Sequence, residues 1–314
     1  MAFWTKRRAA ALGVAALWLG SLGCSGGPAK PEPPKAADTK PDAPKSDPKP
    51  DANLNGAAPT PPPAAKTAPP TDDPLYHPFV EACLSADNPP LVSCMPPDMT
   101  ITDKPTPKLL DAVKQHWDDI RFTTPAGKRI QYTAVFDTDY GMIEIELRPD
   151  LAPNHVRSFV ALIESGYYDG MRFDRIHHEV AAQAPNDLPL DFVEAGRTLD
   201  KGETVKDTIG YWLKFENSLP LTHDVGAVGF MHPPGCPDSS ACSFYIMLSS
   251  DPYLDLEYTV FGKVTAGLDK VRTMFTQPVI VEDSDSPGDN RPKDPILIHK
   301  ATVRTQVVEA AGGK

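Results

Sequence analysis

Residues 130–308 predict a mainly β domain, an antiparallel barrel capped by two helices. Many short segments of this region alternate apolar and polar residues, as strands with one buried face do. A helical spacing of apolar residues is clear at only two places, and strands and helices do not alternate as they do in βαβ units. Short strands of this kind are typical of antiparallel barrels.

The N-terminus predicts an export signal over residues 1–23. A basic start is followed by an apolar run from Ala9 to Gly23, which is shorter than the roughly 20 residues of a membrane-spanning helix. The run ends just before Cys24, and this junction resembles the lipobox of bacterial lipoproteins, in which the cysteine carries the lipid. Ordinary secretion stays open, because Ser21 and Gly23 also form a small-x-small cleavage pattern.

Residues 24–74 predict a disordered tether. From Pro28 to Pro74 the chain has 15 prolines in 47 residues and no aromatic residue. Such a segment buries too little apolar surface to offset the entropy lost on ordering, and proline favours an extended backbone.

Residues 75–129 are expected to form a cysteine-containing extension docked on the main domain. Its helical part is indicated by apolar residues near helical spacing: Leu109, Leu110, Val113 and Trp117.

The main domain begins with two predicted strands joined by the turn "DTDYG". The first alternates from Ile130 to Phe136, and the second alternates from Ile143 to Leu147. Further strands are expected at "DFVEA", "GAVGFM", "SFYIML", "YTVFGKV" and "ILIHKATVRT", and residues 309–314 are expected to be a disordered tail.

The two helices of this domain are expected at "APNHVRSFVALIESG" and "AGLDKVRTMFTQ". In the first, Val156, Phe159, Val160 and Ile163 lie on one helical face. Pro153 suits its start and Gly166 its end.

Net charge and cysteine content limit the possible functions. A net charge of −11 argues against nucleic acid and against an anionic membrane patch as partners. Besides Cys24 the chain has four cysteines, an even number that suggests disulfides in an exported protein. Sequence leaves three connectivities open, and we expect the local one, listed here by pair: Cys83 with Cys94, and Cys236 with Cys242. A metal site is not expected, because the cysteines and histidines lack tight ligand spacing.

Two separated regions resemble the cyclophilin-type peptidyl-prolyl isomerases. They are "GMIEIELRPDLAPNHVRSFVALIESGYYDGMRFDRI" and "SFYIMLSSDPYLDLEYTVFGKVTAGLDKV", and the likeness runs from about Ile130 to Val303. The resemblance implies a closed eight-stranded antiparallel barrel, no cofactor or metal, and Pro-containing segments of exported polypeptides as partners. It leaves the oligomeric state open.

The same resemblance assigns the candidate site. Arg175 of "FDRI" falls on the catalytic arginine of the family. The residues that it places at the substrate are Phe192, Val193, Met231, His232, Ser243, Tyr245, Tyr253, Leu254 and Tyr258. On spacing alone Arg175 could instead be a strand-surface arginine paired with Asp174 or Glu194.

The polar part of the site departs from the family. Ala195 stands where the family has a glutamine that orients the arginine, and 16 residues separate Arg175 from Phe192, which is an insertion at the rim. His177 and His178 within it are expected in a solvated loop. The sequence therefore predicts a membrane-anchored isomerase of the cell envelope, on the periplasmic side. The alternative is a cyclophilin-like module that binds proline segments as a chaperone with little or no turnover.

Overall fold

The computed structural model describes residues 68–90, 95–179, 188–197, 208–281 and 289–308. The predicted export signal, Cys24, most of the predicted tether, Cys94 and the tail lie outside these residues. In the described part of the chain no helix is long and apolar enough to cross a membrane.

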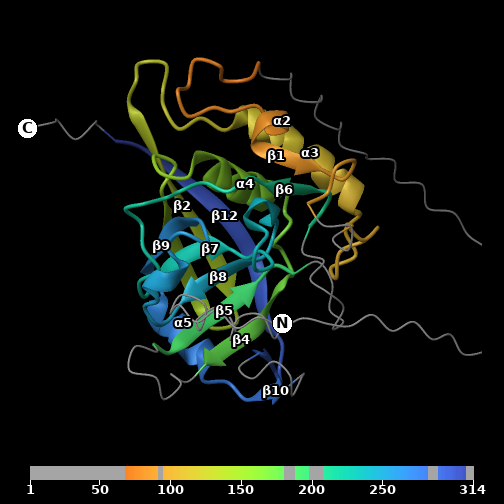
Figure 1. Cartoon of the computed structure of the whole chain (residues 1–314), viewed down its shortest axis with the longest axis vertical. Helices are drawn as coiled ribbons and strands as arrows, with labels where there is room; N and C mark the ends of the chain where they lie inside the picture. The colour runs from red at the N-terminus through yellow and green to blue at the C-terminus, as the bar shows by residue number, and fades with distance from the viewer. Residues whose placement is uncertain (1–67, 91–94, 180–187, 198–207, 282–288, 309–314) are drawn as a thin grey trace, which may run out of the picture. The chain divides into compact units, whose positions relative to one another are not determined.

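Eight antiparallel strands close into a barrel (Figure 1). They pair in the order β4, β12, β2, β3, β9, β7, β8 and β5, and β5 pairs back with β4 to close the ring. The strands are β2 (Arg129–Thr138), β3 (Gly141–Leu147), β4 (Arg172–Glu179), β5 (Leu190–Ala195), β7 (Ala227–Phe230), β8 (Phe244–Met247), β9 (Val260–Ala266) and β12 (Ile296–Val308). The predicted fold class is confirmed.

The alternation seen in the sequence sets which side chains face the barrel core. On β3, Ile143, Ile145 and Leu147 are fully buried, while Glu144 and Glu146 between them are partly exposed. Two further strands lie outside the ring: β11 (Asp289–Pro292) pairs with β4, and β10 (Val279–Val281) pairs with β11.

Both predicted helices of the barrel domain are present. Helix α4 (Pro153–Glu164) has Phe159 at the centre of the core. The ring of Phe159 lies 4.9–5.8 Å from the rings of Phe136, Tyr168, Phe230, Phe244 and Phe261. Helix α5 (Leu268–Phe275) buries Val271 and Met274 and contacts β3 and β5.

The N-terminal extension is built into the same core. It contains α2 (Phe79–Ala82), β1 (Cys83–Ser85) and the predicted helix, α3 (Thr106–Asp119), which packs on α4 (Figure 1). Strand β1 pairs with β6 (Tyr211–Leu213). The buried apolar residues of α3 belong to the hydrophobic cluster that fills the barrel: Leu109, Val113 and Trp117.

The predicted disulfide between Cys236 and Cys242 is not formed in the structure. Cys236 is half-buried on the turn before the short 3-10 helix η2 (Pro237–Ser239) and is not oxidised. Cys242 follows that turn and is fully buried in the main core, so the two side chains lie in different environments. Cys83 is also in thiol form, and burial raises its pKa.

Candidate active site

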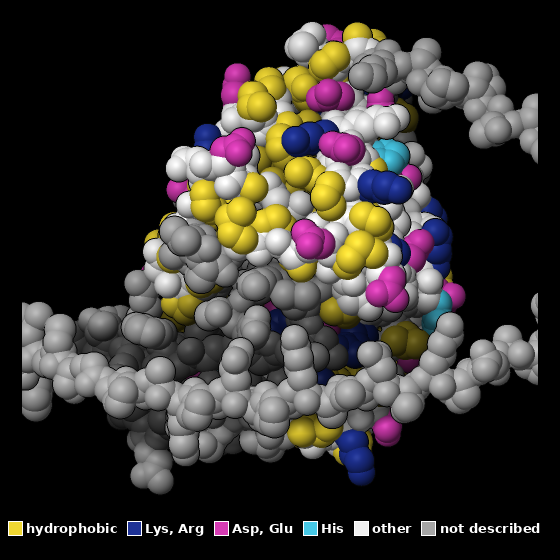
Figure 2. All heavy atoms as spheres, turned by 90° about the vertical axis from the view of Figure 1, so that its right-hand side faces the viewer, with side chains coloured by type: hydrophobic (Ala, Val, Ile, Leu, Met, Phe, Trp, Pro, Cys, Tyr) yellow, Lys and Arg dark blue, Asp and Glu magenta, His cyan; other side chains and the backbone are white. Residues whose placement is uncertain are grey.

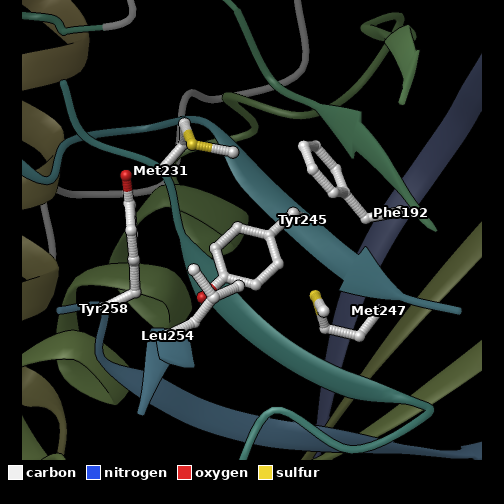
Figure 3. Close-up of a pocket in the computed structure, with 6 residues that line it drawn as sticks. All are labelled: Phe192, Met231, Tyr245, Met247, Leu254 and Tyr258. Atoms are coloured by element: carbon white, nitrogen blue, oxygen red, sulfur yellow. The ribbon is translucent and has the colours of Figure 1, made fainter. Parts of the chain in front are cut away.

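A small apolar pocket lies between β5, β8 and the segment that precedes β9. It is a shallow hollow, because the roughly 180 Å³ of empty space within it is open to solvent and encloses no room for a water molecule. The residues that line it are Phe192, Met231, Tyr245, Met247, Leu254 and Tyr258 (Figure 3). Because strands β5 and β8 pair Phe192 with Met247, one wall of the pocket is fixed by barrel hydrogen bonds. Such a pocket suits an apolar ring and offers it no charge.

In Figure 3 the ring of Tyr245 lies among the other five side chains that line the pocket. Its hydroxyl lies 2.7 Å from Nε2 of His223, and Nδ1 of His223 lies 2.8 Å from the carboxylate of Asp255. The carboxylate accepts from Nδ1–H, so Nε2 accepts a hydrogen bond from the tyrosine hydroxyl. Burial lowers the pKa of His223 and raises that of Tyr245, so both are neutral at pH 7.

The opposite wall, Tyr258, is supported from behind by His232. Their rings are stacked with centroids 4.0 Å apart. The ring nitrogens of His232 lie 2.9 and 2.8 Å from the carbonyl oxygens of Pro233 and Glu257. His232 is therefore a supporting residue and does not line the pocket.

Among the described residues no group of three or more potential ligands could hold a metal ion.

Arg175 lies against the Phe192 wall of the pocket. Its guanidinium carbon is 4.9 Å from the centroid of the Phe192 ring. His177 is stacked on the same ring at 4.7 Å. Both residues belong to β4, which pairs with β5, and His177 is only 5% exposed. The expectation of a solvated loop was therefore wrong for His177, because the β4–β5 pairing continues to Glu179 and Leu190 and covers it.

Glu194 forms an ion pair with Arg175. Oε2 of Glu194 lies 3.2 Å from Nε of Arg175, and Oε1 lies 3.3 Å from Nε of Arg197. Ser243 donates a hydrogen bond from its hydroxyl to Oε1. Glu194 is fully buried, and Arg175 is 8% exposed. Arg175 is thus paired with an acid as the alternative proposed, yet it is buried beside the pocket and does not lie on a strand surface.

Asp174 precedes the arginine and is also buried. Its carboxylate accepts a hydrogen bond from the backbone N–H of Arg197 at 3.0 Å and lies 3.4 Å from Nε of Arg172. Burial raises its pKa to about 7. The Asp174 carboxyl, which precedes Arg175 in the chain, therefore gains or loses its proton near neutral pH.

Besides His232, three residues that the sequence placed at the substrate do not line the pocket. Val193 packs in the main core, because neighbouring residues of a strand face opposite sides. Ser243 contacts Glu194 and not the pocket, while Tyr253 is 54% exposed and is not among the lining residues. Met247 was missed, although it follows Tyr245 at the two-residue spacing of one strand face.

Comparisons with known proteins agree on one family. The family model described as cyclophilin type peptidyl-prolyl cis-trans isomerase/CLD matches residues 133–303. Peptidyl-prolyl cis-trans isomerase B of Bacillus subtilis is 34% identical over 145 residues, which are 46% of this chain and 90% of that protein. A probable peptidyl-prolyl cis-trans isomerase of Brucella suis is 30% identical over 54% of this chain and 82% of its own.

Other similar proteins are longer than the shared region or more distant. Peptidyl-prolyl cis-trans isomerase-like 2 of Gibberella zeae is 29% identical over 54% of this chain, and the match spans only 27% of that protein. A cyclophilin-type isomerase of Cryptosporidium parvum, solved in the presence of the dipeptide Ala-Pro, is 24% identical with a TM-score of 0.44, over 55% of this chain and 99% of its own.

Proposed function

The chain belongs to the cyclophilin-type peptidyl-prolyl cis-trans isomerase family, and on that premise we propose that it catalyses cis–trans exchange of Xaa-Pro bonds at the Arg175 pocket. The observation that carries this proposal is the position of the Arg175 guanidinium, 4.9 Å from the ring that forms one wall of an apolar pocket.

The chemistry demands little beyond such an arrangement. Rotation about a peptide bond is opposed by its partial double-bond character, with a barrier of about 18–20 kcal/mol. A catalyst must hold the proline ring and stabilise the twisted state, in which the amide has lost resonance, better than either planar state. The pocket holds the ring, and Arg175 supplies a permanently charged donor beside it. The reaction is a rotation about the C–N bond, and no covalent bond is formed or broken.

The test compares the full-length protein with Arg175→Ala in an exchange assay on an Xaa-Pro peptide. We expect wild type to accelerate exchange that otherwise takes tens to hundreds of seconds. Arg175→Ala should lower kcat/KM by about 10²-fold, the loss typical of one preorganised donor. Arg304→Ala is the matched control, since Arg304 pairs with Glu144 at 2.6 Å and is largely exposed.

Two outcomes would contradict the proposal. If wild type exchanges the peptide no faster than buffer, the protein is not an isomerase of this substrate. If the peptide nevertheless binds to wild type, the alternative of a chaperone-like binding module gains support. Equal losses in Arg175→Ala and Arg304→Ala would remove Arg175 from its proposed role.

The substrates that we propose are Pro-containing segments of exported polypeptides, met at the cell envelope. Support comes from the sequence of the N-terminus: a basic start, a short apolar run and Cys24 at its end, followed by a proline-rich stretch. A lipid on Cys24 would attach the chain to the membrane, and the stretch up to Pro74 would separate it from the barrel.

Membrane fractionation of the exported protein tests the anchor. Wild type is expected in the membrane fraction, and Cys24→Ser in the soluble fraction. Cys236→Ser serves as the matched control, because it removes another thiol of the chain. Unchanged fractionation of Cys24→Ser would refute lipid attachment at this residue and leave the isomerase proposal intact.

A further inference from the structure

The structure places the carboxylate of Glu194 against the guanidinium of Arg175. We propose that Glu194 is a positioning residue for the reaction: it fixes the guanidinium plane of Arg175 at the pocket wall. This inference rests on the proposed function. It also resolves the difficulty that Ala195 raises, since an alanine cannot orient an arginine.

Strand geometry makes Glu194 the residue able to do this. The β4–β5 register sets Arg175 directly opposite Glu194, and the β5–β8 register sets Glu194 opposite Tyr245. Alternation along β5 puts Glu194 on the same face as Phe192, the pocket wall. Ala195 lies on the other face, in the barrel core, where a longer polar side chain would not reach the arginine.

Burial makes the contacts of Glu194 strong and specific. The residue is fully buried, and a buried carboxylate is stable only when it is paired and hydrogen-bonded. Oε2 lies 3.2 Å from Nε of Arg175. Oε1 accepts a hydrogen bond from the Ser243 hydroxyl and lies 3.3 Å from Nε of Arg197. The hydrogen bond from Ser243 fixes Oε1, and Oε2 attracts the guanidinium of Arg175 as an ion pair, so the carboxylate restrains the arginine through its charge.

The side of Arg175 that Glu194 engages is significant. The contact is made at Nε, the inner nitrogen of the guanidinium fork, and the guanidinium carbon lies over Phe192. The carboxylate at Nε and the Phe192 ring under the guanidinium carbon together restrain the plane of the guanidinium group. The negative charge also separates two guanidinium groups, those of Arg175 and Arg197, that would otherwise repel each other.

The central test is Glu194→Gln, which keeps size and a hydrogen-bond acceptor for Ser243 but removes the charge. We expect kcat for the Xaa-Pro peptide to fall about tenfold, because a small misplacement of a catalytic group is costly. KM should stay within about twofold, because the apolar pocket is unchanged. Glu144→Gln is the matched control: Glu144 also pairs with an arginine, on the outside of the barrel.

A readout independent of catalysis is the Nε–H resonance of Arg175 in a proton–nitrogen NMR spectrum, assigned by its loss in Arg175→Ala. Paired with a buried carboxylate, this proton should exchange slowly with water in wild type and in Glu144→Gln. In Glu194→Gln it should exchange faster, because the buried ion pair that holds the guanidinium in place is lost.

The inference is overturned if Glu194→Gln keeps both kcat and the slowly exchanging proton, or if its loss appears only in KM. An inactive wild type with the proton behaviour as expected would count against the proposed function and not against the positioning of Arg175. If Glu194→Gln does not fold, Ser243→Ala takes its place. It leaves all charges intact, and an unchanged kcat and proton exchange in that variant would equally reject the inference.

Discussion

At the residue scale, the buried chain of Asp255, His223 and Tyr245 decides how the pocket is lined. A buried tyrosine whose hydroxyl lacked a hydrogen-bond partner would lower the stability of the folded protein. Nε2 of His223 accepts a hydrogen bond from that hydroxyl at 2.7 Å. Asp255 accepts from Nδ1–H of the same ring, which fixes the tautomer with an unprotonated Nε2. The pocket therefore presents the ring of Tyr245, and the polar atom is satisfied behind it.

A double-mutant cycle measures this hydrogen bond. We expect Tyr245→Phe to lower the free energy of unfolding by about 1–2 kcal/mol, since Nε2 of His223 loses its buried donor. His223→Leu should cost about as much in wild type and clearly less in the Tyr245→Phe background. Urea unfolding of the four proteins gives the coupling free energy. Additive losses would show that the two side chains do not depend on each other.

Asp174 predicts a pH dependence of stability. Its folded-state pKa is about 7, raised by burial from the ordinary aspartate value of 3.8. Between these two values the folded state binds the proton more tightly, so this group favours folding at low pH and loses that contribution as pH rises to about 7. The difference is about 4 kcal/mol at most, at 1.36 kcal/mol for each pKa unit.

Asp174→Asn should remove this dependence. The free energy of unfolding of wild type minus that of the variant should fall between pH 4 and pH 7, whatever other carboxylates contribute to each protein. Asp150→Asn is the control, because Arg148 lowers the pKa of that carboxyl. Its stabilising contribution is lost only as pH falls below about 4, so the corresponding difference should stay flat between pH 4 and pH 7. A wild-type-minus-variant difference that does not change with pH would show that Asp174 stays ionised throughout this range.

At the element scale, the close approach of β7 and β8 depends on a glycine. Gly229 is paired with Tyr245, and a methyl group added there would collide with the tyrosine hydroxyl and with the carbonyl of Thr259. The flat ring of Tyr245 can lie across β7 only because this position has no side chain.

Gly229→Ala should therefore damage the pocket as well as the fold. We expect a loss of about 1–3 kcal/mol in the free energy of unfolding, typical of overpacking, together with weaker binding of a proline peptide. Gly262→Ala is the comparison, since a methyl there meets the carbonyl of Glu146 and the side chain of Ile145, away from the pocket. Equal peptide affinity in the two variants, each measured where it is folded, would contradict this account.

The strands and helices themselves were largely predictable, because their apolar spacing reports burial directly. The alternation of Ile143, Ile145 and Leu147 and the helical face around Phe159 are properties of short segments. The β4–β5 pairing was not predictable in this way. His177 becomes buried through Phe192 of another strand, and the 16 residues between Arg175 and Phe192 conceal the register from a reader of the sequence.

The site shows the same limit. Motif order located Arg175, Phe192 and Tyr245, and strand alternation could have added Met247. The role of Glu194 depends on which residue of β4 stands opposite it, and that of His223 on a contact with Tyr245 22 residues away. The untested domain boundaries stay predictions.

At the scale of the whole molecule, the N-terminal extension and the barrel share one core. The family match begins at residue 133, yet Trp117 and Phe122 are fully buried in the same cluster as the barrel residues. Arg157 of α4 joins the two parts. It is fully buried and donates to the carbonyl oxygens of Leu75, Trp117 and Ile120, all in the extension.

The guanidinium of Arg157 also lies over aromatic rings of the extension, with its carbon 5.0 Å from the Tyr76 ring and 4.7 Å from the Phe122 ring. Burial lowers its pKa to about 10, so it stays charged at pH 7. A buried charge of this kind depends on its carbonyl partners and on the rings around it.

Removal of the Arg157 side chain or of the N-terminal extension should therefore strongly destabilise the barrel. Arg157→Ala is expected to lower the free energy of unfolding by about 3–5 kcal/mol, because it leaves a cavity in the core and removes the donor from three carbonyl groups. The exposed Arg304→Ala should change it by less than about 1 kcal/mol.

A fragment that starts at Thr124 should lose cooperative thermal unfolding, because the face of α4 that packs on α3 becomes exposed. If that fragment unfolds cooperatively at the temperature of the full chain, the extension is an appendage of the barrel and not part of its core.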